Sequence, residues 1–178
     1  ELALEGWTLA DEVGSYQIYE NDNYVPMGFA YRYYISQEQF ESVPEDERGN
    51  ILMRAVLLDE EQFARCSDIL SPLPDTSLAD RGYDDYVQDC SDRRAAGVAE
   101  FAATRTGFTA VTDYDSDQLV FFSVPYDDGF TATVNGQAAR IEKVDNGLMA
   151  VRVPAGHAEI VFTYRTPGLM LGMAATAV

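Results

Sequence analysis

The fold of this chain is decided by a strand followed by a tight turn, which reads Phe130-Thr131-Ala132-Thr133-Val134-Asn135-Gly136. Apolar side chains alternate with threonines in it, which is the period of a strand with one buried face and one wet face. The Asn-Gly pair then favours a two-residue hairpin loop, because a type I′ turn requires a positive φ at both central positions. The stretch therefore predicts an antiparallel β-hairpin.

Strand-like segments of similar length lie on both sides of this hairpin. They cover about residues 98–104, 107–113, 118–124, 137–144, 147–153 and 157–164. Within them, Leu119-Val120-Phe121-Phe122 is continuously apolar, as expected for a strand buried on both faces. Asn146-Gly147 indicates a second hairpin turn. Strands at this spacing predict a β unit over about residues 98–164, built as an antiparallel β-sandwich or jelly roll.

The residues before this unit contain two aromatic strands and then a helical region. We expect strands near Tyr16 to Tyr19 and Phe29 to Ile35 to join the same sheet system, because such strands need a partner face to bury against. The pattern of residues 36–96 is helical or irregular, with helices that begin after Ser36 and after Asp59 and two more over about 45–57 and 83–94. The predicted fold class is mainly β with a helical insertion (α+β), in a single domain over residues 1–168.

Composition and charge exclude several classes of protein. Thirty acidic residues against twelve basic ones give a formal net charge of −18, so the chain lacks the basic footprint that binds nucleic acid. No run approaches the roughly 20 apolar residues of a membrane-spanning helix. The apolar tail over residues 169–178 is expected to be the start of a truncated membrane helix, with a buried final strand as the alternative.

Motifs that would carry chemistry are incomplete. Asp113, Asp115 and Asp117 alternate like the start of a calcium loop, but Gln118 stands where the loop needs glycine. His157 is the single histidine and follows a turn glycine, without a nucleophile motif elsewhere. We therefore expect no catalytic residue, metal or cofactor in this chain, and no enzymatic activity from it in isolation.

Cys66 and Cys90 are the two cysteines, and their spacing matches no zinc or redox motif. A disulfide between them would stabilise the fold by roughly 3 kcal/mol in the chain-entropy model. The alternative is two buried free thiols. A domain on the oxidising side of a membrane favours the bridge.

The loop after the most apolar strand is the candidate ligand site, and it contains Tyr126, Asp127, Asp128 and Phe130. Tyr126 could stack on a sugar ring while a neighbouring carboxylate accepts hydroxyl hydrogen bonds. In the alternative interpretation the aromatic residues fill the core and the aspartates only shape the turn.

The same loop begins a set of motifs that resembles the C-terminal region of the YfhO family of bacterial multi-pass membrane proteins. The motifs are Leu119-Val120-Phe121-Phe122-Ser123-Val124-Pro125-Tyr126-Asp127-Asp128-Gly129-Phe130, Val134-Asn135-Gly136, Asn146-Gly147-Leu148-Met149-Ala150-Val151, Val153-Pro154-Ala155-Gly156 and Phe162-Thr163-Tyr164-Arg165-Thr166-Pro167-Gly168-Leu169. Tyr19-Glu20-Asn21 with Pro26 and Phe29 also looks like the first strands of the family's ectodomain. Phe130 departs from the family, which usually has Trp there.

The resemblance implies a location and a role. Pro167-Gly168-Leu169 would lead into the last membrane helix, as in the family, and the family's ectodomain would lie on the extracytoplasmic face of the bacterial cell membrane. The membrane part of its own chain would be built like polyprenyl-phosphate-sugar-dependent glycosyltransferases and would hold the catalytic carboxylate. Family members are associated with glycosylation of lipoteichoic acid.

Two functions follow from the resemblance. The domain is either a noncatalytic module that positions a cell-envelope glycan acceptor, or a structural lid or interaction module that binds no sugar. A net charge of −18 opposes contact with a polyanionic teichoic acid, unless cations bridge the two or the contact uses a face that bears arginines.

Overall fold

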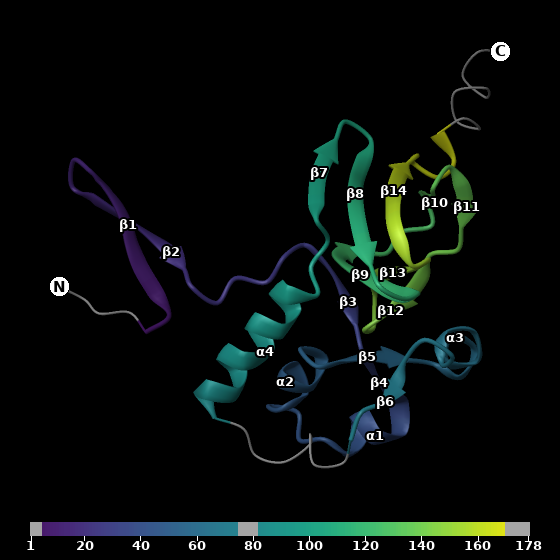
Figure 1. Ribbon diagram of the computed structural model, residues 1–178, viewed down its shortest axis with the longest axis horizontal. Coiled ribbons are helices and arrows are strands. Elements are labelled where there is room, and N and C mark those ends of the chain that lie inside the picture. The colour runs from purple at the N-terminus through teal and green to yellow at the C-terminus, as the bar shows by residue number, and fades with distance from the viewer. Residues whose placement is uncertain (1–4, 75–81, 170–178) are drawn as a thin grey trace.

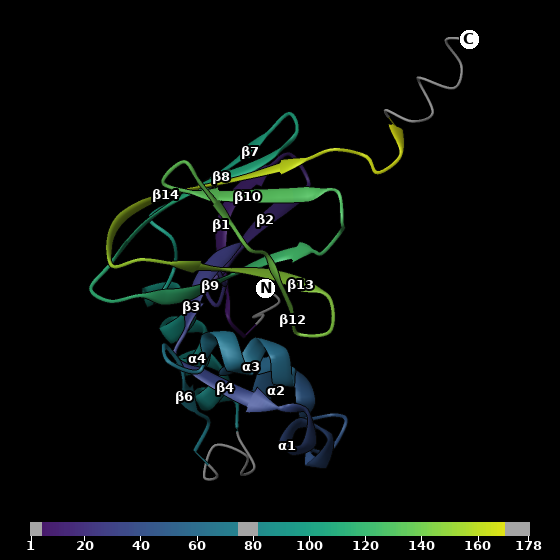
Figure 2. The same ribbon diagram turned by 90° about the vertical axis from the view of Figure 1, so that its right-hand side faces the viewer.

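The computed structural model describes residues 5–74 and 82–169, and it contains the predicted sandwich. Two antiparallel sheets pack face to face (Figure 1), and a smaller α/β unit lies beneath them (Figure 2). The five-stranded sheet has the order β11 (Gln137–Ala139), β10 (Phe130–Val134), β14 (Gly156–Tyr164), β8 (Gly107–Tyr114) and β7 (Glu100–Thr104). The four-stranded sheet has the order β12 (Glu142–Val144), β13 (Leu148–Val153), β9 (Gln118–Pro125) and β3 (Gly28–Tyr31).

Alternating side chains from both sheets form the core of the sandwich. Phe162 and Phe108 stack in its centre with ring centroids 4.4 Å apart, and the ring of Phe122 from the opposite sheet packs edge-on against Phe162. Strand β9 is buried on both faces, as its continuous apolar run predicts. Phe122 faces the sandwich core, whereas Phe121 faces the α/β unit.

Both predicted hairpin turns are present. Asn135 and Gly136 have φ values of 52° and 76°, and Val134 pairs with Gln137, so the loop has two residues. The second turn is longer than predicted: Val144 pairs with Leu148, so the loop has three residues, Asp145-Asn146-Gly147, all with positive φ. The segment predicted as one strand over 137–144 is two strands in different sheets, because the chain crosses between the sheets at residues 140–141.

The region predicted to be helical contains a small parallel sheet. Its strands are β5 (Ala55–Leu58), β4 (Tyr33–Ser36) and β6 (Ser71–Pro72), in that spatial order, and β4 runs parallel to both neighbours. The helix expected over about 45–57 is wrong: only α2 (Arg48–Leu52) is helical, and β5 follows it. All four residues of β5 are buried, and an apolar run of that length fits a parallel strand as well as a helix.

The other predicted helices are confirmed. Helix α1 (Gln37–Ser42) begins with a capping box between Ser36 and Gln39, and α3 (Glu60–Cys66) begins with one between Asp59 and Gln62. Helix α4 (Tyr83–Ala95) lies against β3 through the buried Arg93, whose guanidinium packs over the Tyr31 ring at 5.1 Å and donates to the Ala30 carbonyl.

A second core joins the α/β unit to the outer face of the four-stranded sheet. Phe121 and Ala150 from that sheet pack with Val56, Leu58 and Leu70 from the unit. The Tyr31 hydroxyl donates to the Leu52 carbonyl at 2.5 Å, which ties β3 to the end of α2. The sandwich and the helical insertion therefore share one buried cluster.

The N-terminal strands do not join the sheet system, which corrects the prediction for Tyr16 to Tyr19. Strands β1 (Trp7–Val13) and β2 (Tyr16–Asn21) pair only with each other among the described strands and project away from the body (Figure 1). Every residue of β1 is exposed, and Tyr16 has 77% of its surface exposed. Strand propensity predicted the strands correctly, but it contains no information about which sheet a strand joins.

The two cysteines form no disulfide in the structure. Cys66 ends α3 and packs with Val56, Leu58 and Leu70, whereas Cys90 lies in α4. Both thiols are buried and free, which is the alternative to the bridge expected from an oxidising location.

The expected start of a membrane helix over residues 169–178 lies almost wholly outside the described residues. Within the described part of the chain, no helix is long and apolar enough to span a membrane.

Candidate functional site: an arginine-lined cavity

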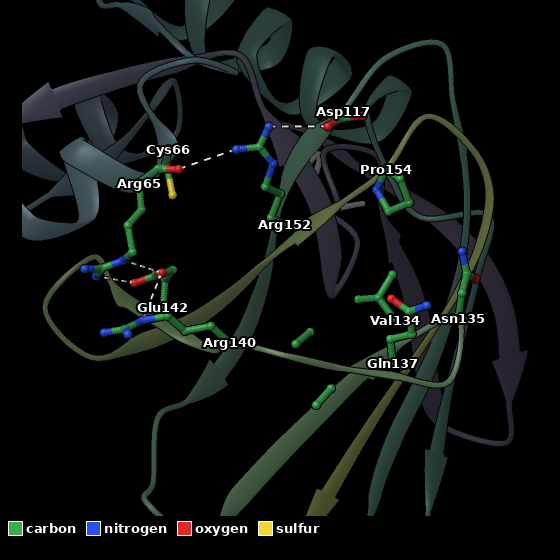
Figure 3. Close-up of a pocket in the computed structure, with 12 residues that line it drawn as sticks. Arg65, Cys66, Asp117, Val134, Asn135, Gln137, Arg140, Glu142, Arg152 and Pro154 are labelled. Carbon is green, nitrogen blue, oxygen red and sulfur yellow. Dashed lines mark hydrogen bonds and ion pairs between the residues drawn. The ribbon is translucent and has the colours of Figure 1, made fainter.

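A cavity of about 530 Å³ opens between α3 and the end of the sandwich where β10 turns into β11 (Figure 3). Its lining comes from α3, the β10–β11 turn, the crossing between the sheets, and the ends of β9 and β13. The residues are Arg65, Cys66, Asp117, Val134, Asn135, Gln137, Ala138, Ala139, Arg140, Glu142, Arg152 and Pro154. Its volume lies in the range of small-molecule sites.

One side of the cavity is built on the buried carboxylate of Glu142 in β12. Arg65 binds it bidentately, through Nε to Oε1 at 2.8 Å and through Nη2 to Oε2 at 2.7 Å. Arg140 approaches the same carboxylate with Nε at 3.3 Å. The hydrogen bond to Glu142 also raises the pKa of Arg65. Glu142 thus holds two guanidinium groups at the mouth of one cavity.

The other side is organised by Arg152 in β13. Its guanidinium binds Asp68 at 3.0 and 2.7 Å and Asp117 at 3.3 Å. The hydrogen bond from Arg152 holds the pKa of Asp68 below its usual value. Asp117 also accepts a hydrogen bond from the backbone N–H of Ala155, at 3.1 Å. This network fixes the turn after β13 beside the end of α3.

Cys66 lines the cavity, and its thiol is not reactive. Burial raises the pKa of Cys66 to about 11, so its sulfur stays protonated at neutral pH. A thiolate is the nucleophilic form of cysteine, so Cys66 serves as a small apolar side chain here. Val134, Ala138 and Pro154 add apolar surface to the cavity lining.

Some donors at the rim remain available to a ligand. The Arg140 side chain is 65% exposed, and its ion pair with Glu142 is made through Nε. The side-chain Oδ1 of Asn135 accepts from the Glu159 N–H at 2.9 Å, which leaves the side-chain amide nitrogen of Asn135 as a donor. Guanidinium and amide donors beside apolar lining residues suit a hydroxyl-rich ligand that carries an anionic group.

The predicted ligand loop lies elsewhere. Phe130 begins β10 and Val134 ends it, so the loop and the cavity are at opposite ends of that strand. Asp127 accepts the Gly129 N–H at 2.7 Å and thereby shapes the turn. The Phe130 ring packs 4.9 Å from that of Tyr164, while Tyr126 is half-buried beneath Lys143 Nζ at 5.6 Å from its ring centroid.

These contacts give the loop a structural task. Its backbone clamps the chain as β14 ends, since the Arg165 N–H donates to the Gly129 carbonyl at 2.9 Å. A side chain at Gly129 would meet the Arg165 carbonyl at 2.4 Å, so only glycine allows this close approach. Burial raises the pKa of Tyr126, and a hydrogen bond with Asp128 raises it by a smaller amount. A ligand role for Tyr126, Asp127, Asp128 and Phe130 stays a prediction.

A family model described as bacterial membrane protein YfhO matches residues 72–176, which is more than half of the 178-residue chain. The chain belongs to the YfhO family. No curated protein and no solved structure matches it.

The residues matched by the YfhO model include only part of the cavity lining. They include α4 and strands β7 to β14, and with them Asp117, Arg140, Glu142 and Arg152. Arg65 on α3 precedes the match, as do β4 and β5. The cavity is therefore formed where the YfhO-type sandwich meets the α/β unit. Sequence reasoning missed it because Arg65 and Glu142 are 77 residues apart and neither stands in a motif.

In the described ranges 5–74 and 82–169, no group of three or more His, Cys, Asp or Glu side chains is placed to hold a metal ion. Asp113 lies near the end of β8 and Asp117 immediately precedes β9, where Arg152 engages it.

Proposed function

We propose that this chain is a noncatalytic extracytoplasmic domain that holds an anionic cell-envelope glycan, such as a lipoteichoic acid acceptor, beside a membrane-embedded glycosyltransferase part of the same protein. Membership of the YfhO family supports the membrane context. The arginine-lined cavity is the surface that would contact the glycan, and the reaction itself would take place in the membrane part.

The observation that carries the proposal is the convergence of three arginines on one cavity. The chain has twelve basic residues in all, and Arg65, Arg140 and Arg152 line the same 530 Å³ space. Arg65 is paired with Glu142, and Arg152 with Asp68 and Asp117. The Arg140 side chain is 65% exposed, so it is the guanidinium that would meet a polyanion despite the net charge of −18. Arginine also recognises phosphate and carboxylate groups with two hydrogen bonds at a time.

The test uses calorimetric titration of the 178-residue chain with poly(glycerol phosphate) teichoic acid, with dextran as an uncharged polymer. Arg140→Gln removes the most available guanidinium and leaves the bidentate pair between Arg65 and Glu142 intact. Loss of charge-assisted hydrogen bonds worth about 1.5 kcal/mol weakens binding roughly tenfold.

Arg105→Gln is the matched control. Arg105 is exposed in the turn between β7 and β8, away from the cavity lining, and its substitution removes the same unit charge. Equal weakening by both variants would mean that the polymer responds only to net charge, and the cavity would then have no part in recognition. The absence of any binding by the unaltered chain would reject the glycan role itself.

The second candidate function is a lid or interaction module, and the β1–β2 hairpin favours it. A two-stranded hairpin is marginally stable alone, and this one exposes Trp7, Val13, Tyr16 and Ile18 to solvent. If the hairpin docks on the membrane part, Tyr16→Ser with Ile18→Thr leaves the thermal stability of the isolated chain unchanged and reduces assembly of the full-length protein. Unchanged assembly would remove this alternative.

A further inference from the structure

A second cavity, of about 580 Å³, lies at the ends of the parallel strands in the α/β unit. It is lined from β4, β5 and β6 and from the first turns of α1 and α3. The residues are Tyr34, Ser36, Gln37, Glu38, Gln39, Leu58, Asp59, Glu60, Phe63 and Pro72. None of them lines the arginine cavity, although α3 contributes to both.

The strand order gives the small parallel sheet a topological switch point, the kind of place where open parallel sheets bind ligands. Strand β4 comes first in the sequence and lies in the middle of the sheet, with β5 on one side and β6 on the other. The connection from β4 to β5 therefore runs across the sheet in one direction, and the connection from β5 to β6 runs back in the other. In open parallel sheets such a switch point leaves a crevice beyond the carboxyl ends of the strands, and ligands occupy it.

Two aromatic rings form the wall of the cavity. The Phe63 and Tyr34 ring centroids are 5.1 Å apart with an interplanar angle of 58°. Phe63 lies on α3. It is a large apolar side chain, yet 42% of its surface is exposed. Part of the Phe63 side chain is therefore accessible to a ligand.

The charges around these rings select the kind of ligand. Glu38, Asp59 and Glu60 line the cavity, and among the described residues no basic side chain lines it. The backbone N–H groups of Gln39 and Gln62 are already bonded to the Ser36 and Asp59 side chains. An anion would therefore meet carboxylates and find these two backbone donors already engaged, whereas a cation would meet negative charge beside aromatic rings.

We propose that this cavity binds an organic ammonium group, carried by a small molecule or by a substituent of a larger one. The nitrogen lies over the Phe63 and Tyr34 rings, where the ring quadrupole attracts a cation. Glu38 and Glu60 complement its charge from the rim. The site goes beyond the glycan-holding function proposed above, and neither depends on the other.

The experiment is an NMR titration of the 178-residue chain with choline and with ethanolamine, with methyl α-glucopyranoside as the neutral probe. Both cations shift resonances of α1, α3 and β4, and the neutral sugar shifts none of them. Phe63→Leu keeps the apolar volume but removes the ring face, and it weakens binding about fivefold, whereas Phe63→Trp strengthens it.

Charge variants provide the matched controls. Glu60→Gln weakens binding at least threefold, while Glu61→Gln, which removes the same charge from the same helix outside the cavity, leaves it within a factor of 1.5, on the order expected for exposed charges. Equal effects of these two variants overturn the proposal, because the cations would then respond only to net charge.

Binding of the neutral sugar with the same affinity, or indifference to Phe63→Leu, also overturns the proposal. Arg140→Gln serves to separate the two sites. It leaves the ammonium titration unchanged, so a failure here leaves the teichoic acid result unaffected.

Discussion

Asp145 gives the sharpest prediction about stability, because burial raises the pKa of its carboxyl group to about 7. The residue is in the turn between β12 and β13, where its Oδ1 accepts the Leu57 N–H of β5 at 2.7 Å. Its Oδ2 lies 3.3 Å from the Tyr31 hydroxyl, whose single proton is already donated to the Leu52 carbonyl. A protonated Asp145 could donate to that hydroxyl oxygen, whereas an ionised one could not.

The magnitude follows from the difference between the folded and unfolded pKa values. A pKa of about 7 in the folded protein exceeds the ordinary 3.8 by about 3 units, each worth roughly 1.4 kcal/mol. Because the folded state binds the proton more tightly, the contribution is fully present below about pH 4 and is lost as the pH rises to about 7. The total loss is on the order of 4 kcal/mol.

Asp145→Asn tests this directly. Asparagine retains the oxygen that accepts from Leu57, supplies a permanent N–H donor toward Tyr31, and tolerates the positive φ of this turn. Urea unfolding should show the variant gaining about 2 kcal/mol or more relative to the unaltered chain between pH 5 and pH 8. Asp115→Asn, at an exposed turn position, is the control. A stability difference that stays constant across this pH range would refute the reasoning.

Two further predictions concern the loop clamp and the thiols. Gly129→Ala should lower the free energy of unfolding by about 2 kcal/mol, because the new methyl group would overlap the Arg165 carbonyl. Gly49→Ala, with open space around it, should be neutral or stabilising, and equal losses from both variants would contradict the clamp. Cys66 and Cys90 should react with iodoacetamide only after denaturation, as seen by intact mass, since both are buried and burial raises the Cys66 pKa. Rapid labelling of the native chain, or a mass two hydrogens short in denaturant, would contradict free buried thiols.

Short-range patterns in the sequence determined the elements whose causes are local. The turn at Asn135-Gly136 and the capping boxes at Ser36 and Asp59 involve residues at most three positions apart. Backbone conformation and nearby side chains specify such features without help from the rest of the fold. The alternating strands of the sandwich were likewise predictable, because one buried face imposes a period of two.

Patterns that fit two structures were resolved only by packing. Ala55-Val56-Leu57-Leu58 is apolar throughout, and its place beside β4 in a buried parallel sheet made it a strand. Strands β1 and β2 were recognisable as strands, but their isolation from both large sheets depends on tertiary contacts.

The two cavities depended on the tertiary structure entirely. Arg65, Arg140 and Arg152 come from a helix, a crossing between sheets and a strand, and Glu142 holds two of them only after the α/β unit has packed on the sandwich. Phe63 and Tyr34 form one wall because β4 and β5 are neighbours in a parallel sheet. The sequence by itself determined local conformation and family, whereas long-range packing decided which side chains share a site, because contacts between distant residues leave no periodic signal.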